Sequence, residues 1–341
     1  MKKLTIFCTS IIMCLAIVFG MAGCSDGNTS NKIRLNEVTH SIFYAPLYVA
    51  INNGYFEDEG LEIELTNGGG ADKVMTALVS GEADIGLMGP EASIYVVQEG
   101  AKDKPVVFGQ LTKRDGSFLM SHTAMPDFKW SDLKGKEIIG GRRGGVPAMV
   151  LQYVLEQNGL KVGDALSSTV DTILNLDVQF NLVAAAFEGK PNSYCTMFEP
   201  TASEYEVNGK GYIVASIGQA SGEIPYTAFT AKSSYLKSNA KNAEKFLTAV
   251  MNGYYYIMNN SLDAVAQSLK PSFSSASLES IKQAVSQYKM IDAWNNTPVM
   301  TQDSFDRLQT IMQNAGELTN KVAFKDVVDN SIAYKVMQSF N

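Results

Sequence analysis

The sequence predicts a two-lobed α/β protein in which each lobe is built around a mainly parallel β-sheet. Short apolar runs typical of strands alternate with helical patterns from residue 32 onward. Strand–helix–strand units with this rhythm form right-handed crossovers and parallel sheets. The alternation ends near residue 115 and starts again after it, which gives two units of ordinary domain size. A last strand near residue 226 precedes a helical C-terminal third.

The first unit is predicted to contain strands and helices in strict alternation. Apolar residues at a spacing of two, or in short continuous runs, predict strands at 33–38, 61–65, 85–88 and 106–111. Apolar residues on one helical face predict helices at 46–53, 72–80 and 90–98. The glycines at 68–70 predict a loop between the second strand and the second helix.

The second unit repeats this alternation. Strands are predicted at 137–139, 172–174, 194–198 and 212–216, and helices at 146–158 and 182–188. A strand at 226–231 is expected to return to the first unit. Four further helices are predicted at 243–258, 262–269, 277–288 and 305–314.

The lobes are defined by where the alternation restarts. Lobe one is predicted to hold residues 32–115 and 226–341, and lobe two residues 116–225. The chain would cross between them near residues 112–117 and 221–226, and both segments carry a glycine, where backbone dihedrals can change. Ligands of open α/β sheets bind outside the carboxyl ends of the strands, so we expect a ligand between the lobes.

The first residues have the pattern of a bacterial secretory signal peptide. Lys2 and Lys3 precede an apolar run over residues 4–19, which is too short and wrongly flanked for a stable spanning helix. The following letters, GMAGC at 20–24, are similar to a lipobox, whose cysteine is acylated after cleavage. Ordinary secretion with a chance cysteine is the alternative.

We therefore expect residues 1–23 to be a lipoprotein signal peptide and residues 24–31 to be a flexible tether of polar composition. Cys24 would carry the lipid. The protein would then be extracytoplasmic and anchored to the outer face of the cytoplasmic membrane.

Cysteine usage and charge narrow the class of protein further. Cys8 and Cys14 would leave with the signal peptide and Cys24 would be acylated, so only Cys195 remains and no internal disulfide can form. The formal net charge is -7, which gives no electrostatic basis for binding nucleic acid. We expect a monomer that a hydrophobic core alone holds together.

Several strings resemble one family of binding proteins. They are APLYVA at 45–50, NGYFEDEGLEI at 53–63, ALVSGEADIG at 77–86, GPE at 89–91, DLKGK at 132–136 and FEP at 198–200. Together they resemble the solute-binding lipoproteins of ABC importers for sulfonates, nitrate, taurine and thiamine precursors, over nearly the whole chain after the signal peptide. Where that family commonly has an Asp-Ala pair, this chain has Ser193 and Tyr194, which leaves the local geometry near Glu199 open.

The resemblance implies both a fold and a function. The fold is the periplasmic-binding-protein type II, or Venus-flytrap, fold. The implied function is to capture a small molecule between two lobes by hinge closure and to deliver it to the permease and ATPase subunits of an ABC importer. A lipid-anchored sensor that uses the same clamp is an alternative.

Two loops of lobe one carry candidate ligand-binding residues. Phe43 and Tyr44 lie before Pro46, in a loop expected to face the cleft, where their rings would stack on or wall off a ligand. Core packing is the alternative for both rings. Gly69 and Gly70 would bring backbone N–H groups to a ligand, or would form a plain turn.

A third loop of lobe one joins a strand to a helix at Gly89 and Glu91. Glu91 would accept a ligand N–H there, or would cap the helix. The two interpretations are equally compatible with the sequence.

The most distinctive segment of lobe two is GGRRGGVP at 140–147. Gly144, Gly145 and Val146 lie at the start of a long helix, whose free amides and dipole favour an anion or a carbonyl group. Arg142 and Arg143 would add charge-assisted bonds to a ligand, or would lie on the surface or bridge to a carboxylate of lobe one.

Three further positions complete the candidates. Glu199 is a polar anchor by the family resemblance, with a hinge or helix-start role as the alternative. Tyr226 is a weaker ligand-binding candidate at the second crossing. Trp294 is expected to cover the core, and Cys195 to be a buried inert thiol.

An enzyme would need a poised nucleophile, base or metal, and the sequence offers few. His40 and His122 are the only histidines and neither has a second ligand at metal spacing, so we expect no metal and no cofactor. A Gly-x-Ser-x-Gly elbow and the Cys-rich motif of the related yeast-type pyrimidine synthase are both missing from the sequence. The glycine-rich helix start favours a small anion such as a sulfonate or nitrate as ligand. The aromatic loop with Glu199 favours a nitrogen heterocycle such as a thiamine pyrimidine precursor.

Overall fold

The computed structural model describes residues 31–340, with the backbone alone at position 180. The predicted signal peptide, Cys24 and nearly all of the predicted tether lie outside the described residues. Within the described range, every helix is too short or too polar to cross a membrane.

The first sheet has five strands in the order β2-β1-β3-β11-β4. The strands are β1 (Lys32–Glu37), β2 (Glu62–Asn67), β3 (Ile85–Met88), β4 (Pro105–Thr112) and β11 (Thr227–Lys232). β1 pairs in parallel with β2 and β3, and β11 runs antiparallel between β3 and β4. The register sets Leu35 opposite Leu65 and Ile85, so apolar side chains form a row across the sheet.

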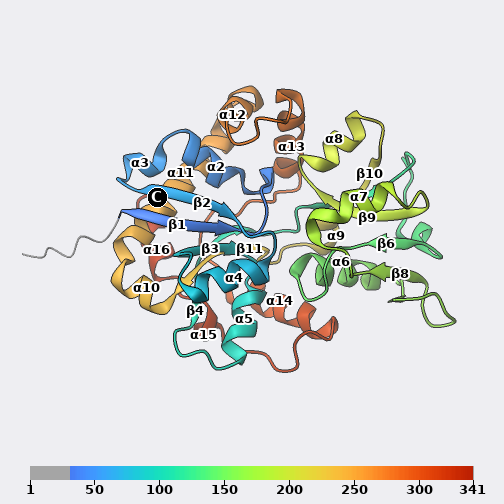
Figure 1. Ribbon diagram of the computed structural model, residues 1–341, viewed down its shortest axis with the longest axis horizontal. Coiled ribbons are helices and arrows are strands. Elements are labelled where there is room, and N and C mark those ends of the chain that lie inside the picture. Colours follow the sequence, from blue (N-terminus) through green and yellow to red (C-terminus); the bar gives the residue numbers. More distant parts are fainter. Residues whose placement is uncertain (1–30, 341) are drawn as a thin grey trace, which may run out of the picture. The chain divides into compact units, whose positions relative to one another are not determined.

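The second sheet has six strands in the order β10-β5-β9-β6-β8-β7. The strands are β5 (Ser117–Ser121), β6 (Glu137–Ile139), β7 (Val162–Gly163), β8 (Thr172–Asn175), β9 (Ser193–Phe198) and β10 (Tyr212–Ser216). β6, β7, β8 and β9 are parallel, and β5 runs antiparallel between β9 and β10. Figure 1 shows β1 to β4 of the first sheet in blue to teal, β11 of the same sheet in yellow, and β6, β8 and β9 of the second sheet in green to yellow-green.

Helices flank both sheets. The helices that follow β1, β2 or β3 along the chain are η2 (Ile42–Tyr44), α2 (Ala45–Asn52), α3 (Tyr55–Asp58), α4 (Ala71–Ser80) and α5 (Glu91–Gln98). Those of the second unit are η3 (Trp130–Leu133), α6 (Val146–Gln157), η4 (Phe180–Leu182), α7 (Val183–Glu188), α8 (Thr201–Val207) and α9 (Ile217–Ser221). The C-terminal helices are α10 (Ser233–Ser238), α11 (Ala240–Asn259), α12 (Leu262–Leu269), α13 (Leu278–Met290), α14 (Gln302–Asn314), α15 (Phe324–Val327) and α16 (Ser331–Met337).

The core beneath the first sheet depends on a close approach of two helices. α11 packs along α2, and a Cβ at Gly253 would lie 2.0 Å from the carbonyl oxygen of Pro46. Only glycine fits there, because any larger residue would force the helices apart. The rings of Phe229 and Phe246 meet edge-on beside them, with centroids 4.9 Å apart, and fill the space under the sheet.

Two chain segments join the sheets, one at residues 113–116 and one at residues 217–226, which contains α9. They lie side by side, since the N–H of Tyr226 donates to the carbonyl of Thr112 at 3.2 Å and that of Ile224 to Lys113 at 2.9 Å. Each segment leads into the antiparallel strand of the sheet that it enters, β5 or β11. A paired ribbon of this kind can bend as a unit.

The predicted sheets and helices agree closely with these elements. The prediction that both sheets are mainly parallel is confirmed, and the predicted strand at 85–88 matches β3 residue for residue. No element was predicted at β5, β7, η3, α8, α9, α10, α15 or α16, and residues 55–58 were part of a motif in which α3 was not recognised. The prediction missed β5 because serines at both ends leave only three consecutive apolar residues in it.

Candidate ligand-binding site

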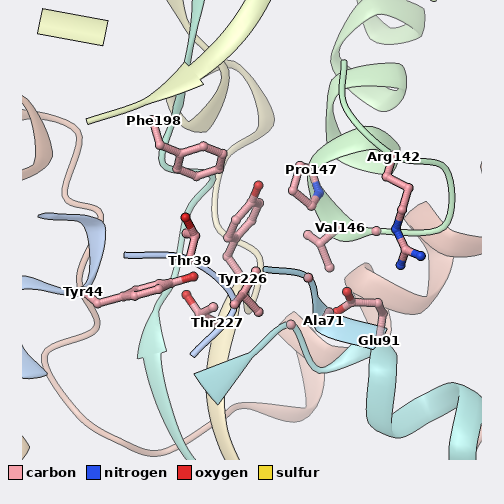
Figure 2. A pocket seen from close by; sticks show the side chains of 14 residues that line it. Thr39, Tyr44, Ala71, Glu91, Arg142, Val146, Pro147, Phe198, Tyr226 and Thr227 are labelled. Carbon is pink, nitrogen blue, oxygen red and sulfur yellow. The ribbon is translucent and has the colours of Figure 1, made fainter. Parts of the chain in front are cut away.

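A cavity of about 70 Å³ lies between residues of the first and the second sheet (Figure 2). Loops that follow β1, β2, β3, β6 and β9, together with the residues that begin β11, contribute its lining. The lining residues are Val38, Thr39, Tyr44, Gly70, Ala71, Gly89, Glu91, Arg142, Gly145, Val146, Pro147, Phe198, Tyr226 and Thr227. The volume is sufficient for several water molecules or one small organic group.

The first sheet presents a buried acid to this cavity. Glu91 is the first residue of α5 and its exposed fraction is 2%. Its side chain folds back over Gly89, where a Cβ would lie 1.9 Å from Glu91 Oε2. Gly89 is therefore required for this conformation of Glu91, because any side chain at that position would displace the carboxylate.

The carboxylate of Glu91 is incompletely bonded. Oε2 has no hydrogen-bond partner among the described residues, although it is buried. Burial raises the pKa of Glu91 to about 7, whereas the backbone N–H groups of Glu91, Val146 and Ala92, and the charge of Arg142, act in the opposite direction. A buried acceptor without a donor is costly, so the geometry favours a ligand that supplies one.

The second sheet presents the start of a long helix. α6 begins at Val146 with Gly145 as its N-cap, and a proline follows in the first turn, where its missing N–H costs nothing. Gly144 has a φ of 79°, a left-handed conformation that favours glycine. Its carbonyl accepts a hydrogen bond from the hydroxyl of Tyr95 at 3.1 Å, which joins α5 of the first sheet to this loop.

The arginines of this loop have different partners. Arg142 lines the cavity and its Nη1 lies 3.1 Å from Asp72 Oδ2 in α4, so the pair bridges the two sheets. Arg143 instead faces Asp164 of its own unit at 3.4 Å and does not line the cavity. Arg142 therefore has the alternative role given above for these arginines, a bridge to a carboxylate of lobe one.

Tyr44 and Tyr226 bring hydroxyl groups to the cavity from the first loop and from the second crossing (Figure 2). The Tyr226 side chain is buried, and its hydroxyl faces the carboxylate of Asp115. Burial is the main cause that raises the pKa of Tyr226 well above its usual value, and the charge of the nearby Asp115 adds to the effect. Burial likewise raises the pKa of Asp115 to about 7, against the opposing effect of hydrogen bonds from Ser117 and Tyr226.

Phe43, predicted together with Tyr44, does not line the cavity. The Phe43 ring packs against two other rings. Its centroid lies 5.2 Å from that of the Tyr288 ring and 5.6 Å from that of the Tyr226 ring. A Cβ at Gly116 would lie 2.4 Å from the Phe43 ring, so this glycine lets the ring pack against the first crossing segment. Trp294 is buried beside them, as expected, and its Nε1 donates to the Phe43 carbonyl at 2.9 Å.

Gly69, Gly144 and Glu199 also lie outside the lining of this cavity. Gly69 donates its N–H to the Asn67 side chain at 2.9 Å in a local turn. Glu199 is buried, and its two carboxylate oxygens accept from the N–H of Ser203 at 2.9 Å and from the Ser203 hydroxyl at 2.7 Å. This is the helix-start role, since both donors belong to the first turn of α8.

A second cavity of about 160 Å³ adjoins the first, with which it shares Thr39, Pro147 and Phe198. Glu199 lines this second cavity, as does His40. The imidazole of His40 lies 3.0 Å from Glu37 Oε1 and 2.8 Å from the Ser272 carbonyl. The hydrogen bond with Glu37 raises the pKa of His40, against the opposing effect of burial.

The sequence analysis did not identify several lining residues. Thr39, Ala71, Pro147, Phe198 and Thr227 all line the first cavity. Thr39 lies four residues before Phe43, and each of the others is adjacent in sequence to a predicted site residue. Asp115 carried no sequence signal, because nothing in the pattern places it beside Tyr226. Among residues 31–340, no cluster of His, Cys, Asp and Glu could hold a metal ion.

Comparison with known proteins connects this geometry to a family. The family described as "NMT1/THI5 like" matches residues 42–264, which is more than half of the chain. The chain belongs to this family. A Bacillus subtilis (strain 168) protein, YtlA, which is named as a binding protein, is 40% identical over 320 residues and covers 94% of each chain. This NMT1/THI5-like chain is therefore a substrate-binding protein.

Two other comparisons bear on the fold and on chemistry. The alkanesulfonate-binding protein SsuA from Xanthomonas axonopodis pv. citri, solved bound to MOPS, superimposes with a TM-score of 0.69 at 15% identity, over 88% of this chain and 99% of its own. The periplasmic-binding-protein fold is thereby confirmed. A Schizosaccharomyces pombe 4-amino-5-hydroxymethyl-2-methylpyrimidine phosphate synthase is 31% identical over 114 residues, which is 32% of each chain.

Proposed function

We propose that this protein is the extracytoplasmic solute-binding component of an ABC importer, which captures a small nitrogen heterocycle between two lobes and delivers it to a permease. The observation that carries the proposal is the cavity lined by loops of both sheets, with Glu91, whose Oε2 has no partner, and Tyr226 among the residues that line it. Binding proteins of this fold grip a ligand where such loops converge. No step of chemistry is required of the lining residues.

The lining favours a heterocycle over a small anion. Glu91 can accept from an N–H group, and Tyr44 and Tyr226 offer hydroxyls in an otherwise mostly apolar setting. The Phe198 ring and Pro147 stand at the border with the second cavity, where a flat ring would find apolar faces. A pyrimidine with an amino group, of the kind that the fission yeast relative is named for, has these features.

Two contacts that join the sheets around the cavity support the proposal that the lobes close on a ligand. Arg142 pairs with Asp72, and Tyr95 donates to Gly144, so both contacts would break if the sheets separated. The lobe boundaries that we propose are 32–115 with 226–341, and 116–225, with the two joining segments as the hinge. A ligand that contacts both sides would shift the population toward this closed arrangement.

Thermal unfolding with candidate ligands tests capture. We expect an aminopyrimidine to raise Tm clearly, and sulfonates and nitrate to have little effect. Ala71→Trp should abolish the shift because Ala71 lines the cavity, and Val79→Trp on the exposed face of the same helix is the matched control. A Tm shift that survives in Ala71→Trp would place binding elsewhere.

X-ray scattering in solution tests closure with the ligand that stabilises most. The account predicts a smaller radius of gyration with ligand than without it. An unchanged radius with a tightly bound ligand would contradict the hinge and leave the binding cavity intact.

We also propose that Cys24 is acylated and that its lipid tethers the chain to the outer face of the cytoplasmic membrane. We propose that the tethered protein is a monomer. The support is the sequence pattern of the first residues. Cys24→Ser should move the protein from the membrane fraction to the soluble fraction, and mass spectrometry should find a lipid on Cys24 in the wild type. Membrane retention of Cys24→Ser would contradict the anchor.

Import, as opposed to sensing or catalysis, is tested by uptake of a labelled aminopyrimidine in cells. Deletion of the gene should abolish uptake, and a copy that carries Ala71→Trp should fail to restore it. Uptake that is unaffected, together with an altered transcriptional response, would support the sensor. Turnover of the pyrimidine by the purified protein would support an enzyme.

A further inference from the structure

The N-terminus of α6 has the properties of an anion site. The helix runs for 12 residues, its N-cap Gly145 offers no side-chain bond, and no acidic residue lies in its first turn. Free N–H groups and the dipole therefore concentrate positive potential at Val146, which lines the cavity. Left to itself, this end of α6 would attract a sulfonate, a nitrate or a carboxylate.

An acid from the opposite sheet already faces this helix end. The Glu91 carboxylate comes from α5, is almost fully buried, and lies near enough to the start of α6 for the N–H of Val146 to lower its pKa. Figure 2 shows Glu91 and Val146 lining the same side of the cavity. Gly89 makes this placement possible, because only a glycine leaves room for the carboxylate that folds over it.

We propose that Glu91 is an internal anion at the start of α6 that makes the cavity select N–H-donating or cationic ligands and reject anions. The proposal rests on the proposed function, because it assigns the ligand class of the same cavity. Oε2 of Glu91, which has no partner, is the acceptor left for a ligand donor. The charge on Glu91 thus both satisfies the helix and sets the sign of the ligand.

The cation nearest to this acid is not free to bind an anion. Arg142 is the one Lys or Arg among the described residues that line the cavity, and its guanidinium is paired with Asp72 at 3.1 Å. An anionic ligand would have to share a buried space with Glu91 without a spare positive charge, and like charges at short distance in a low dielectric repel strongly. A ligand N–H meets no such opposition.

Removal of the Glu91 charge should therefore create an anion site. Glu91→Gln keeps the shape of the side chain, which protects the fold, and Glu37→Gln is the matched control. Glu37 is also a buried carboxylate, but it bonds His40 and Tyr48 and does not line the cavity. Circular dichroism would verify that both variants fold.

The probes are ethanesulfonate and nitrate, titrated by calorimetry at about pH 8.5, above the Glu91 pKa of about 7. We expect Glu91→Gln to bind at least one probe about tenfold more tightly than the wild type or Glu37→Gln. A folded Glu91→Gln that binds both probes no more tightly than the wild type would overturn the proposal.

The result separates this inference from the proposed function. Gain of anion binding by Glu91→Gln, with no binding of an aminopyrimidine by the wild type, would support the charge filter and contradict the heterocycle as ligand. Pyrimidine binding by the wild type without gain of anion binding in Glu91→Gln would support the heterocycle as ligand and contradict the charge filter.

Discussion

The β3–α5 turn of the first sheet and the β9–α8 turn of the second place a glutamate at the same kind of position. Glu91 and Glu199 each lie where a strand gives way to a helix, each is almost fully buried, and burial raises the pKa of each to about 7. The two differ in their partners. Ser203 satisfies both oxygens of Glu199, whereas Oε2 of Glu91 has no partner and faces a cavity.

This difference shows that burial and a raised pKa do not by themselves mark a ligand-binding acid. The carboxylate of Glu199 is fully bonded inside its own unit and holds the start of α8, whereas the backbone of Glu199 bonds Ser41 and Tyr288 of the first unit. Glu91 is reached by the helix of the opposite sheet and keeps bonding capacity for a ligand. We therefore assign a structural role to the first and a binding role to the second, although both were candidates by sequence.

The largest expected difference between the two acids is in stability. Glu199→Ala leaves the buried N–H of Ser203 without an acceptor and opens a void, so it should lower the free energy of unfolding by about 3 kcal/mol. Glu91→Ala removes an incompletely bonded group beside a cavity and should cost about 1 kcal/mol or less. Denaturant unfolding of both variants makes the comparison, and equal losses would remove the distinction.

A somewhat smaller effect is expected from pH. Both carboxyls have a pKa of about 7 in the folded state against a usual value of 4.5, so the folded protein binds protons that the unfolded chain releases. Stability should therefore fall as pH rises from about 5 to about 8, by about 2 kcal/mol for each group.

Glutamine substitutions separate the contributions to this pH dependence. Glu91→Gln and Glu199→Gln should each remove one share of the slope, and Asp115, whose pKa burial also raises to about 7, should account for a third. An N–H-donating ligand should suppress the share of Glu91 and leave that of Glu199. A wild-type stability that does not change between these pH values would contradict the pKa shifts.

The smallest effect is expected at the contact between Arg142 and Asp72. Both side chains are about half exposed, at 40% and 50%, so the pair should stabilise the closed form by less than about 1 kcal/mol. Asp72→Asn should weaken ligand affinity by about fivefold or less, and high salt should erase the difference. A much larger loss would mean that Asp72 or Arg142 contacts the ligand directly.

Much of the fold could be predicted from the sequence because apolar periodicity is a local property. The helix of Val146–Gln157 and the strand of Ile85–Met88 follow directly from their apolar spacing. The prediction missed β5 because serines flank only three consecutive apolar residues there, and it missed the seven-residue α8, whose start is held by Ser203 donating to the Glu199 carboxylate. Short elements of this kind depend on contacts that tertiary structure sets.

The site was predictable as a set of loops but not as a set of side chains. Phe43 and Tyr44 are adjacent, and the sequence cannot tell which ring faces the cavity. The fit of Phe43 against Gly116 depends on residues more than seventy positions apart. The sequence allows either arginine to bridge to a carboxylate of lobe one, and only the positions of the two sheets select Arg142 and Asp72 as the pair.

The titration of the two carboxyl groups by NMR tests the central claim most directly, with protein labelled with carbon-13 at glutamate side chains. The account predicts a pKa of about 7 for both groups without ligand. It also predicts that an N–H-donating ligand lowers the pKa of Glu91 and leaves that of Glu199 unchanged. A ligand that moves both values equally, or that moves only Glu199, would contradict the assignment of Glu91 as the acid that binds it.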